Sequence, residues 1–240
     1  MYEADFADVY DLIYRHRGKD YRAEAHYLAE LVRGHHRTAR SVLDVACGTG
    51  GHLCHLRDCF TVADGLEISP EMLAIARKRL PEGCLHQGDM RDFDLGRRYD
   101  AITLMFSSIG YVTDKADLDR TLACLARHLT PGGVVVIEPW VFPDTFVSGY
   151  VSSDLVRDHE CGRTIARFSH SVRDGDAVRM TVHYLTGDAG GLRHLSDTHR
   201  LALFTREQYE DAFAQAGCPA EFIRPEGWFN RGLFVGVNLG

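Results

Sequence analysis

A glycine-rich turn and a downstream carboxylate are the residues whose types and spacing best suit chemistry. Residues 42–50 read Val-Leu-Asp-Val-Ala-Cys-Gly-Thr-Gly, and Glu67 ends the next apolar run. An apolar run that leads into a Gly-x-Gly turn predicts a strand followed by a loop whose backbone a ligand can approach closely. A carboxylate at the end of the second strand can accept hydrogen bonds from the two hydroxyls of a ribose. Together these features predict a nucleoside site on an α/β sheet.

Two kinds of nucleoside site begin in this way. The dinucleotide fingerprint Gly-x-Gly-x-x-Gly needs a third glycine where this chain has Leu53, so the sequence weakens that interpretation. Asp44 before the loop instead resembles motif I of the class I S-adenosylmethionine (SAM) methyltransferases, Asp/Glu-x-Gly-x-Gly-x-Gly, with Ala46 replacing the first glycine. A tight strand-to-helix turn without a ligand is the remaining alternative.

SAM has an adenosine, a methionine tail and a sulfonium cation, and each part needs different contacts. Glu67 would bind the ribose hydroxyls. Asp89 follows the third expected strand, where it either accepts from the adenine amino group or caps a turn. Met105 ends the fourth strand, where it either faces the sulfonium or belongs to the core. The motifs thus predict SAM contacts from Ala46, Gly48, Glu67, Ile68, Asp89, Met90 and Met105.

The elements that must position these residues alternate between strand and helix. Short apolar strands separated by helices indicate right-handed crossovers and a parallel sheet, whose ligands bind at the carboxyl ends of the strands. Ser69-Pro70-Glu71 predicts the start of one helix through a cap and a proline at the first helical position. We expect strands at 41–45, 61–67, 84–87, 101–105 and 134–138, and helices at 20–33, after Gly50, at 72–80 and at 117–129.

The pattern changes after Glu138. The segments 164–173, 177–185 and 194–204 alternate with period two and predict an antiparallel insertion. Thr205 and Gln208 form a capping-box pattern for a last helix, and two strands at 221–224 and 233–237 return to the main sheet. The predicted fold is an α/β, Rossmann-like class I methyltransferase with a mostly parallel seven-stranded sheet. Its SAM-binding core would comprise residues 1–139 and 205–240, and its β insertion residues 140–204.

Composition excludes several other classes of protein. The formal net charge is -7 without a dense Lys/Arg cluster, which argues against nucleic acid as a partner. No apolar run approaches ~20 residues, which argues against a membrane span. The 7 cysteines are scattered, as in a reduced cytoplasmic protein. None of the 13 histidines, including His52 and His55, has a partner at a recognised ligand spacing, so we expect no metal.

Further motifs point to one family of methyltransferases. The chain resembles the nucleotide-linked aminosugar N-methyltransferases, which build the dimethylamino sugars of macrolide and related antibiotics. The similarity spans nearly the whole chain, from the opening Met-Tyr-Glu onwards. It rests on Leu-Asp-Val-Ala-Cys-Gly-Thr-Gly (43–50), Gly-Asp-Met-Arg-Asp-Phe (88–93), Met-Phe-Ser-Ser-Ile-Gly (105–110), Pro-Gly-Gly-Val-Val-Val (131–136), Glu-Pro-Trp (138–140) and Arg-Gly-Leu-Phe-Val-Gly (231–236).

The resemblance implies methyl transfer from SAM to the amine of a dTDP-linked aminosugar, leaving S-adenosylhomocysteine. Tyr2 matches a family tyrosine beside the amine, and Tyr111 stands where close relatives carry a histidine. A tyrosine titrates near ~10, so Tyr111 is expected to position the amine, and we assign no dedicated base. Tyr10 is expected to reach the cofactor and Tyr14 the sugar. Their spacing is also ordinary for an amphipathic helix.

A nucleotide diphosphate requires cations from an otherwise acidic chain. Guanidinium groups suit phosphate oxygens, although an exposed arginine on a sheet is an equally ordinary reading. The predicted substrate-binding residues are Tyr14, Trp140, Tyr150, Arg167, Ser169, His170, Arg179 and Arg231. The insertion could also pair two subunits as a homodimer. The alternatives are O- or C-methylation of another metabolite, and a nucleotide-binding protein that has lost the chemistry.

Overall fold

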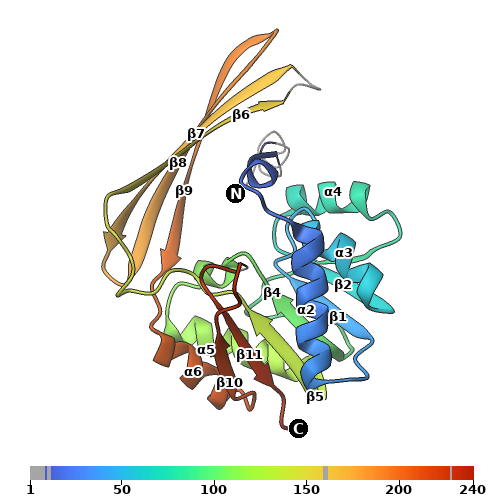
Figure 1. Ribbon diagram of the computed structural model, residues 1–240. Coiled ribbons are helices and arrows are strands. Elements are labelled where there is room, and N and C mark those ends of the chain that lie inside the picture. Colours follow the sequence, from blue (N-terminus) through green and yellow to red (C-terminus); the bar gives the residue numbers. More distant parts are fainter. Residues whose placement is uncertain (1–8, 10–11, 159–161, 228) are drawn as a thin grey trace.

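The computed structural model describes residues 9, 12–158, 162–227 and 229–240, which form two separate sheets (Figure 1). The larger sheet has seven strands in the order β10-β11-β5-β4-β1-β2-β3. Strands β1 to β5 are parallel, and β11 is antiparallel to both β5 and β10. The strands are β1 (Ser41–Val45), β2 (Val62–Glu67), β3 (Cys84–Gln87), β4 (Tyr99–Leu104), β5 (Leu129–Ile137), β10 (Ala220–Ile223) and β11 (Leu233–Val237).

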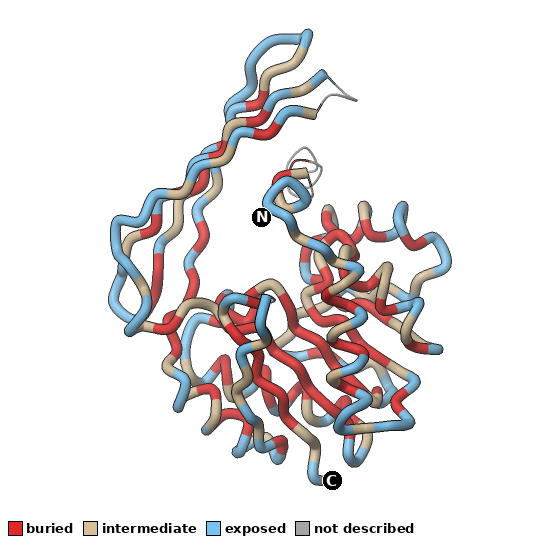
Figure 2. Tube along the Cα trace, viewed as in Figure 1, coloured by how far each residue is buried: buried red, intermediate tan, exposed pale blue. Residues whose placement is uncertain are grey.

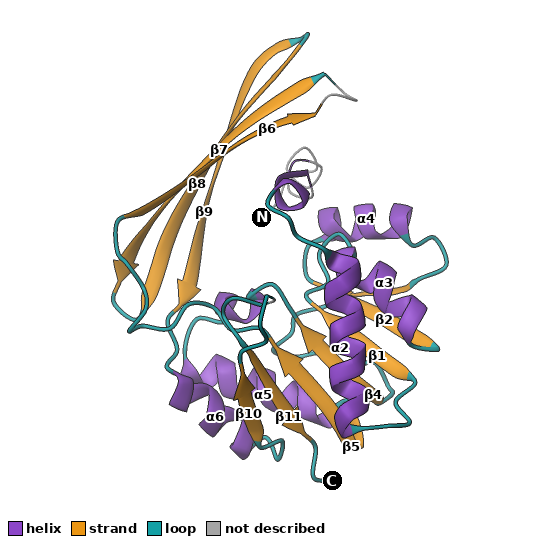
Figure 3. Ribbon diagram, viewed as in Figure 1, coloured by secondary structure: helices purple, strands orange, loops and turns teal. Residues whose placement is uncertain are grey.

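Helices cover both faces of this sheet, as Figure 3 shows. One core cluster joins α2 and α3 to the sheet through residues such as Val32 and Val136. The other joins α5 and α6 to the opposite face through residues such as Val135 and Phe213. Val135 and Val136 are neighbours on β5, and successive strand residues point to opposite faces. The helices are α2 (Tyr21–His35), α3 (Gly51–Cys59), α4 (Pro70–Arg79), α5 (Lys115–Arg127) and α6 (Arg206–Gln215).

The predicted helix starts are confirmed by their caps. The Ser69 hydroxyl accepts from the Met72 amide at 3.2 Å, with Pro70 at the first turn of α4. The Thr205 hydroxyl accepts from the Gln208 amide at 3.2 Å, and the Gln208 side chain accepts from the Thr205 amide at 2.8 Å. Each side chain satisfies a backbone N–H that the helix itself leaves without an acceptor.

One predicted boundary between helix and strand is wrong. Helix α5 ends at Arg127, and β5 already begins at Leu129 instead of 134. The early part of β5 pairs Leu129 with Tyr99 before a register shift. The sequence did not predict this early start, because Pro131-Gly132-Gly133 is typical of a turn. None of the helices in the described ranges is long and apolar enough to cross a membrane.

The insertion is a sheet of four antiparallel strands, where the sequence predicted three. They are β6 (Tyr150–Asp158), β7 (Arg163–Asp174), β8 (Ala177–Asp188) and β9 (Gly191–Ala202). Strand β6 was missed because Ser152 and Asp154 occupy positions on its inner face where a simple amphipathic strand would place apolar residues. Both side chains accept hydrogen bonds from Arg17. The four-stranded sheet extends away from the core in Figure 1.

The insertion sheet has two unlike faces, which alternate along the strands in Figure 2. Its inner face includes the buried Arg167 and Tyr184, which are neighbours across β7 and β8. Val182 and Tyr184 pack there in one cluster with Val9 and Ile13 from the amino-terminal segment. Its outer face leaves Phe168 and other apolar side chains exposed. The amino-terminal segment therefore fills the angle between the two sheets.

Candidate active site

The glycine loop after β1 has an unusual backbone. Ala46, Gly48 and Gly50 have φ values of 54°, 57° and 80°, in the region that favours glycine. Glycine adopts this conformation without strain, whereas a side chain costs roughly 1–3 kcal/mol. Ala46 occupies the position of the first glycine of motif I. Its positive φ explains why the motif prefers glycine there. A Cβ added to Gly48 would meet nothing within 4 Å, which leaves its backbone open to a ligand.

Glu67 is fixed against this loop by two hydrogen bonds. Its Oε2 accepts from the Gly48 amide at 2.9 Å, and its Oε1 accepts from the Ser69 amide at 2.9 Å. The side chain is only 8% exposed. A carboxylate has about four acceptor positions, so each oxygen keeps one for a further donor. These features fit a carboxylate that receives the two hydroxyls of a ribose.

Buried charges behind the loop were not predicted from the sequence. Asp44 is buried and accepts from the Thr103 hydroxyl at 2.8 Å. Burial raises the pKa of Asp44 to about 6. Glu24 on α2 lies 2.7 Å from both His52 on α3 and Lys19. No short motif contains such a set, because its members come from distant parts of the chain.

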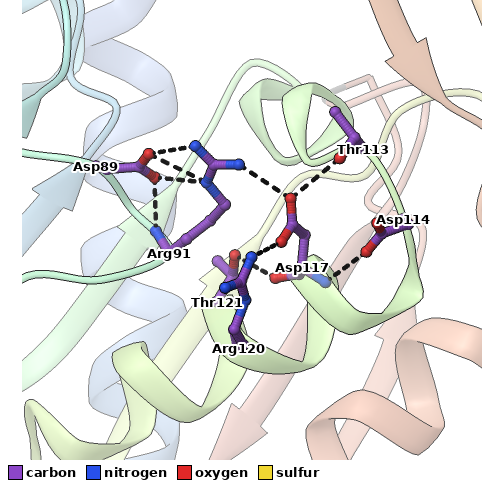
Figure 4. Close-up of polar contacts among 7 residues, drawn as sticks. All are labelled: Asp89, Arg91, Thr113, Asp114, Asp117, Arg120 and Thr121. Atoms are coloured by element: carbon purple, nitrogen blue, oxygen red, sulfur yellow. Dashed lines mark hydrogen bonds and ion pairs between the residues drawn. The ribbon is translucent and has the colours of Figure 1, made fainter.

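Asp89 lies in a network of ion pairs (Figure 4). The Arg91 Nε donates to both Asp89 oxygens at 3.0 and 3.1 Å, and this contact lowers the pKa of Asp89. Arg91 also donates to Asp117 at 3.0 Å. Hydrogen bonds from Arg120 and then Arg91 lower the pKa of Asp117 to about 2. Asp89 also accepts from the Arg91 amide at 2.9 Å, so its side chain caps this turn, the alternative that the sequence left open, and Arg91 contacts both of its oxygens.

The three apolar residues predicted at the cofactor have different environments. Ile68 directly follows Glu67 and is 58% exposed, so its side chain is free to cover a bound base. Met90 is partly buried and packs against the core. Met105 is 3% exposed and belongs to the core cluster beneath α2, the alternative that the sequence left open.

The turn after β4 holds strained backbone beside these residues. Phe106 and Ser107 have φ values of 58° and 60°. The Phe106 amide donates to Glu138 Oε2 at 2.8 Å, and the Ser107 hydroxyl donates to the Pro139 carbonyl at 2.8 Å. Tyr14 packs edge-on against Phe106 with ring centres 4.6 Å apart. Strain of this kind concentrates at functional sites.

Arg231 covers the other side of the same turn. It donates to the Ser107 hydroxyl at 3.2 Å, and its guanidinium lies 4.5 Å from the ring centre of Trp140. Burial lowers the pKa of Arg231. The Trp140 Nε1 is buried with no hydrogen-bond partner in the described part of the chain. Tyr150 is 60% exposed at the start of β6, on the face that carries Asp154.

Tyr111 lies across from the insertion sheet and meets a histidine there. Its hydroxyl is 3.1 Å from Nδ1 of His199 on β9, and the two rings pack edge-on. His199 was not among the predicted residues. Only its place on the inner face of the expected strand 194–204 could have drawn attention to it.

Two arginines, Arg17 and Arg167, lie together on the inner face of the insertion sheet. Arg17 donates from Nε to Asp154 at 2.9 Å. Arg167 lies 3.7 Å from the same carboxylate and donates to Ser169 at 3.2 Å. Arg167 is 4% exposed, and its Nε has no partner among the described residues. Two cations therefore share one anion, which leaves an excess of one positive charge.

Other predicted site residues lie elsewhere. Tyr2 and Tyr10 fall outside the described residues. His170 and Arg179 are exposed on the outer face, the opposite side of the sheet from Arg167 and Ser169, because they occupy the alternate positions of β7 and β8. The structure therefore does not bring these two residues to the site.

Within the described ranges, a single group of side chains has metal-like spacing. It comprises Asp64, Cys84 and His86 near the amino ends of β2 and β3, away from the glycine loop. Asp64 already accepts from the Tyr99 hydroxyl at 2.7 Å and lies 3.3 Å from the Arg97 guanidinium. A cation at this position would compete with Arg97 for the Asp64 carboxylate.

The site can thus hold a nucleoside at one end and an anion at the other, with polar aromatic side chains between them. Glu67 and Asp89 supply acceptors at the carboxyl ends of the parallel strands, and Arg167 and Arg231 supply positive charge opposite. Such a site suits a displacement in which positioning of the reactants contributes most of the rate enhancement, an effect of ~7–11 kcal/mol at most.

Comparisons with known proteins agree with this geometry. A methyltransferase domain family matches residues 42–133. The chain is 56% identical over 240 residues to dTDP-3-amino-3,4,6-trideoxy-alpha-D-glucopyranose N,N-dimethyltransferase of Streptomyces venezuelae, covering 99% of both. It is 53% identical over 237 residues to dTDP-3-amino-3,6-dideoxy-alpha-D-glucopyranose N,N-dimethyltransferase of Streptomyces fradiae, covering 98% of this chain and 92% of the relative.

Solved structures give the same result. The crystal structure of DesVI from Streptomyces venezuelae matches with a TM-score of 0.93 and 56% identity, over 98% of this chain and 99% of that one. A SAM-bound amino pentose methyltransferase of calicheamicin biosynthesis, from Micromonospora echinaspora, matches with a TM-score of 0.88 and 47% identity, over 96% of each chain.

Proposed function

This chain belongs to the family of SAM-dependent dTDP-aminosugar N,N-dimethyltransferases, and we propose that its own substrate is a dTDP-linked 3-amino-deoxysugar, methylated twice. The two relatives described above act on 3-amino sugars, whereas a 4-amino-sugar dimethyltransferase from Saccharopolyspora spinosa is 45% identical. The higher identity to the first two supports the 3-amino position. The family membership supports N-methylation over O- or C-methylation and over a protein without activity.

The glycine loop and its carboxylates fit SAM. Glu67 would hold the ribose through its two remaining acceptor positions, and Asp89 would accept from the adenine beneath Ile68. The open backbone at Gly48, together with the nearby Ala46, would adjoin the methionine tail. SAM itself supplies the electrophilic methyl group. The absence of a metal requirement stays a prediction.

The sugar nucleotide would occupy the inner face of the insertion sheet. The paired cations Arg17 and Arg167 supply one excess positive charge for a diphosphate, and the unpartnered Nε of Arg167 supplies a buried donor. Guanidinium groups bind phosphate oxygens well because their donors match the oxygens in geometry and charge. Trp140 and Tyr150 would contact the base, and Tyr14 and Tyr111 the sugar.

The outer face of the insertion sheet supports the proposed homodimer. Several large apolar side chains are exposed there together, and such patches mark interfaces. A two-fold axis would pair the face with its own copy. The exposed residues of this outer apolar face are Val151, Leu155, Phe168, Leu185 and Leu192. The cytoplasmic location also stays a prediction.

The hydrogen bonds that join Glu67 to the glycine loop are the observation that best supports the cofactor assignment, and product analysis tests the substrate. The protein is incubated with SAM and a panel of dTDP-3-amino and dTDP-4-amino sugars, and products are analysed by mass spectrometry. We expect mass gains of one and then two methyl groups with a 3-amino sugar. Turnover of a 4-amino sugar alone would overturn the assignment.

A further inference from the structure

A buried histidine of the insertion sheet reaches a residue of the methyltransferase core. His199 on β9 is 8% exposed, and its Nδ1 lies 3.1 Å from the Tyr111 hydroxyl on the short helix η1 (Ser108–Tyr111). The rings meet edge-on with centres 5.9 Å apart. Tyr111 is 41% exposed, so one side of this residue faces the histidine while another remains accessible.

The other ring nitrogen of His199 faces an acid. His199 Nε2 lies 3.8 Å from Asp197 Oδ2 on the same strand. This arrangement favours the tautomer with the proton on Nε2 and leaves Nδ1 as an acceptor for the Tyr111 hydroxyl. Burial lowers the pKa of His199, with Asp197 acting in the opposite direction and Arg167 in the same one. Burial thus favours the neutral imidazole, whose Nδ1 can accept a proton.

The proposed reaction releases a proton at each methylation. An amine attacks carbon with its lone pair, and an ammonium has none. A substrate bound as the primary ammonium must lose a proton before the first transfer, and the monomethylammonium formed by that transfer must lose one before the second. If both transfers occur without release, the second proton must leave inside a site that is closed on one side by the insertion sheet.

We propose, on the basis of the proposed function, that Tyr111 and His199 form the route by which protons leave the substrate nitrogen. The N–H bond of the ammonium breaks, and its proton binds to the Tyr111 oxygen as the tyrosine's own proton passes to His199 Nδ1. The nitrogen keeps the electron pair, and the tyrosine stays neutral throughout. The imidazolium then loses its Nε2 proton to water beside Asp197, and the resulting Nδ1–H imidazole must return to the Nε2–H tautomer by proton exchange with water before the next transfer.

The imidazole of this pair comes from β9, and Tyr111 spans the distance between it and the site. His199 acts through Tyr111 and is a positioning and proton-accepting group that does not touch the substrate.

The test measures the dependence of the methylation rate on pH for His199→Gln and Tyr111→Phe. His26→Gln and Tyr27→Phe, on α2, are the matched controls. Well above the pKa of the sugar amine, which is measured by titration, both site variants should match the wild type within about threefold. At pH 7 they should be slower by roughly 10²-fold or more, in the range of general-base effects. Monomethyl product should also accumulate, while the control variants keep the wild-type profile and products.

Three results would overturn the proposal. They are a site-variant profile that superimposes on the wild type, a loss that is equal at every pH, and an unchanged ratio of dimethyl to monomethyl product. Calorimetry with SAM shows whether each variant is folded, and Tyr111→Phe tests the route if His199→Gln does not fold. Failure of the proposed function is distinguishable, because the wild type itself would then methylate no aminosugar.

Discussion

The amide of Gly48 donates to Oε2 of Glu67 at 2.9 Å, so the glycine loop is joined to the carboxylate that we propose as the ribose acceptor. Glu67 thereby has two functions. It closes the loop at the end of β1 and presents its remaining lone pairs to the ligand.

Replacing Glu67 by alanine should weaken SAM binding by roughly 10- to 100-fold, because hydrogen bonds to a charged group contribute ~1.5–3 kcal/mol each. The melting temperature should also fall, since the Gly48 and Ser69 amides lose their acceptor. Calorimetry and thermal unfolding measure the two effects. Glu82→Ala, at an exposed position, is the control. An unchanged SAM dissociation constant in a folded variant would contradict the role of Glu67.

Asp44→Asn should remove a pH dependence of stability. Burial raises the pKa of Asp44 to about 6, from 3.8. The folded state therefore binds the proton more tightly, and the stability of the wild type should fall as pH rises from about 4 to about 6. The difference from the variant should approach about 3 kcal/mol above that window. Denaturant unfolding between pH 4 and 7 measures it, and parallel curves for the two proteins would refute it.

Arg17→Met should raise the KM for the nucleotide sugar by roughly tenfold, because one of two cations near the diphosphate is lost. The affinity for SAM should change little. Initial rates at saturating SAM give the KM, and Arg15→Met, which is exposed in the same segment, is the control. If SAM affinity falls as much as sugar affinity, Arg17 supports the cofactor or the fold.

Ala46→Gly should stabilise the protein slightly. The strain at φ 54° is relieved by ~1–2 kcal/mol, and the greater freedom of glycine in the unfolded chain offsets ~0.4–1 kcal/mol of this gain. We expect a net increase of about 0.5 kcal/mol in the free energy of unfolding, measured with denaturant. A loss of more than about 1 kcal/mol would show that the Ala46 side chain makes stabilising contacts.

Phe168→Glu tests the proposed homodimer. A charge in the outer apolar face should shift the protein from dimer to monomer in analytical ultracentrifugation. Thr164→Glu lies on the same face at an exposed polar position and should have a smaller effect. A wild-type protein that sediments as a monomer at micromolar concentration would contradict the interface.

Local signals in the sequence predicted the parts of the site that lie on one stretch of chain. The loop 42–50, Glu67 and the caps at Ser69 and Thr205 depend on neighbours within a few residues, so short patterns contain them. Residue types and spacing were therefore sufficient to predict a nucleoside site at the loop 42–50 and Glu67.

Contacts between distant residues could not be predicted in this way. Tyr111 and His199 are 88 positions apart, and Arg17 and Asp154 are 137 apart. Their proximity arises because the insertion sheet packs against η1 through β9 and against the amino-terminal segment through β6. Strand β6 was missed for a related reason. Its inner-face residues Ser152 and Asp154 are polar and accept hydrogen bonds from Arg17, so the strand lacks a simple alternation of polar and apolar residues.

The insertion leaves the core once, after β5, and returns once, before α6. Tyr150 and Arg167, which we assign to the sugar nucleotide, thus lie in one continuous stretch, whereas Tyr14, Arg17 and Tyr111 come from outside it. Glu67 and Asp89, which we assign to the cofactor, lie wholly outside the insertion. Exchanging residues 150–202 between relatives would therefore leave the SAM pocket intact but transfer only one half of the sugar-nucleotide site, so a change of sugar preference also requires matching residues in the core.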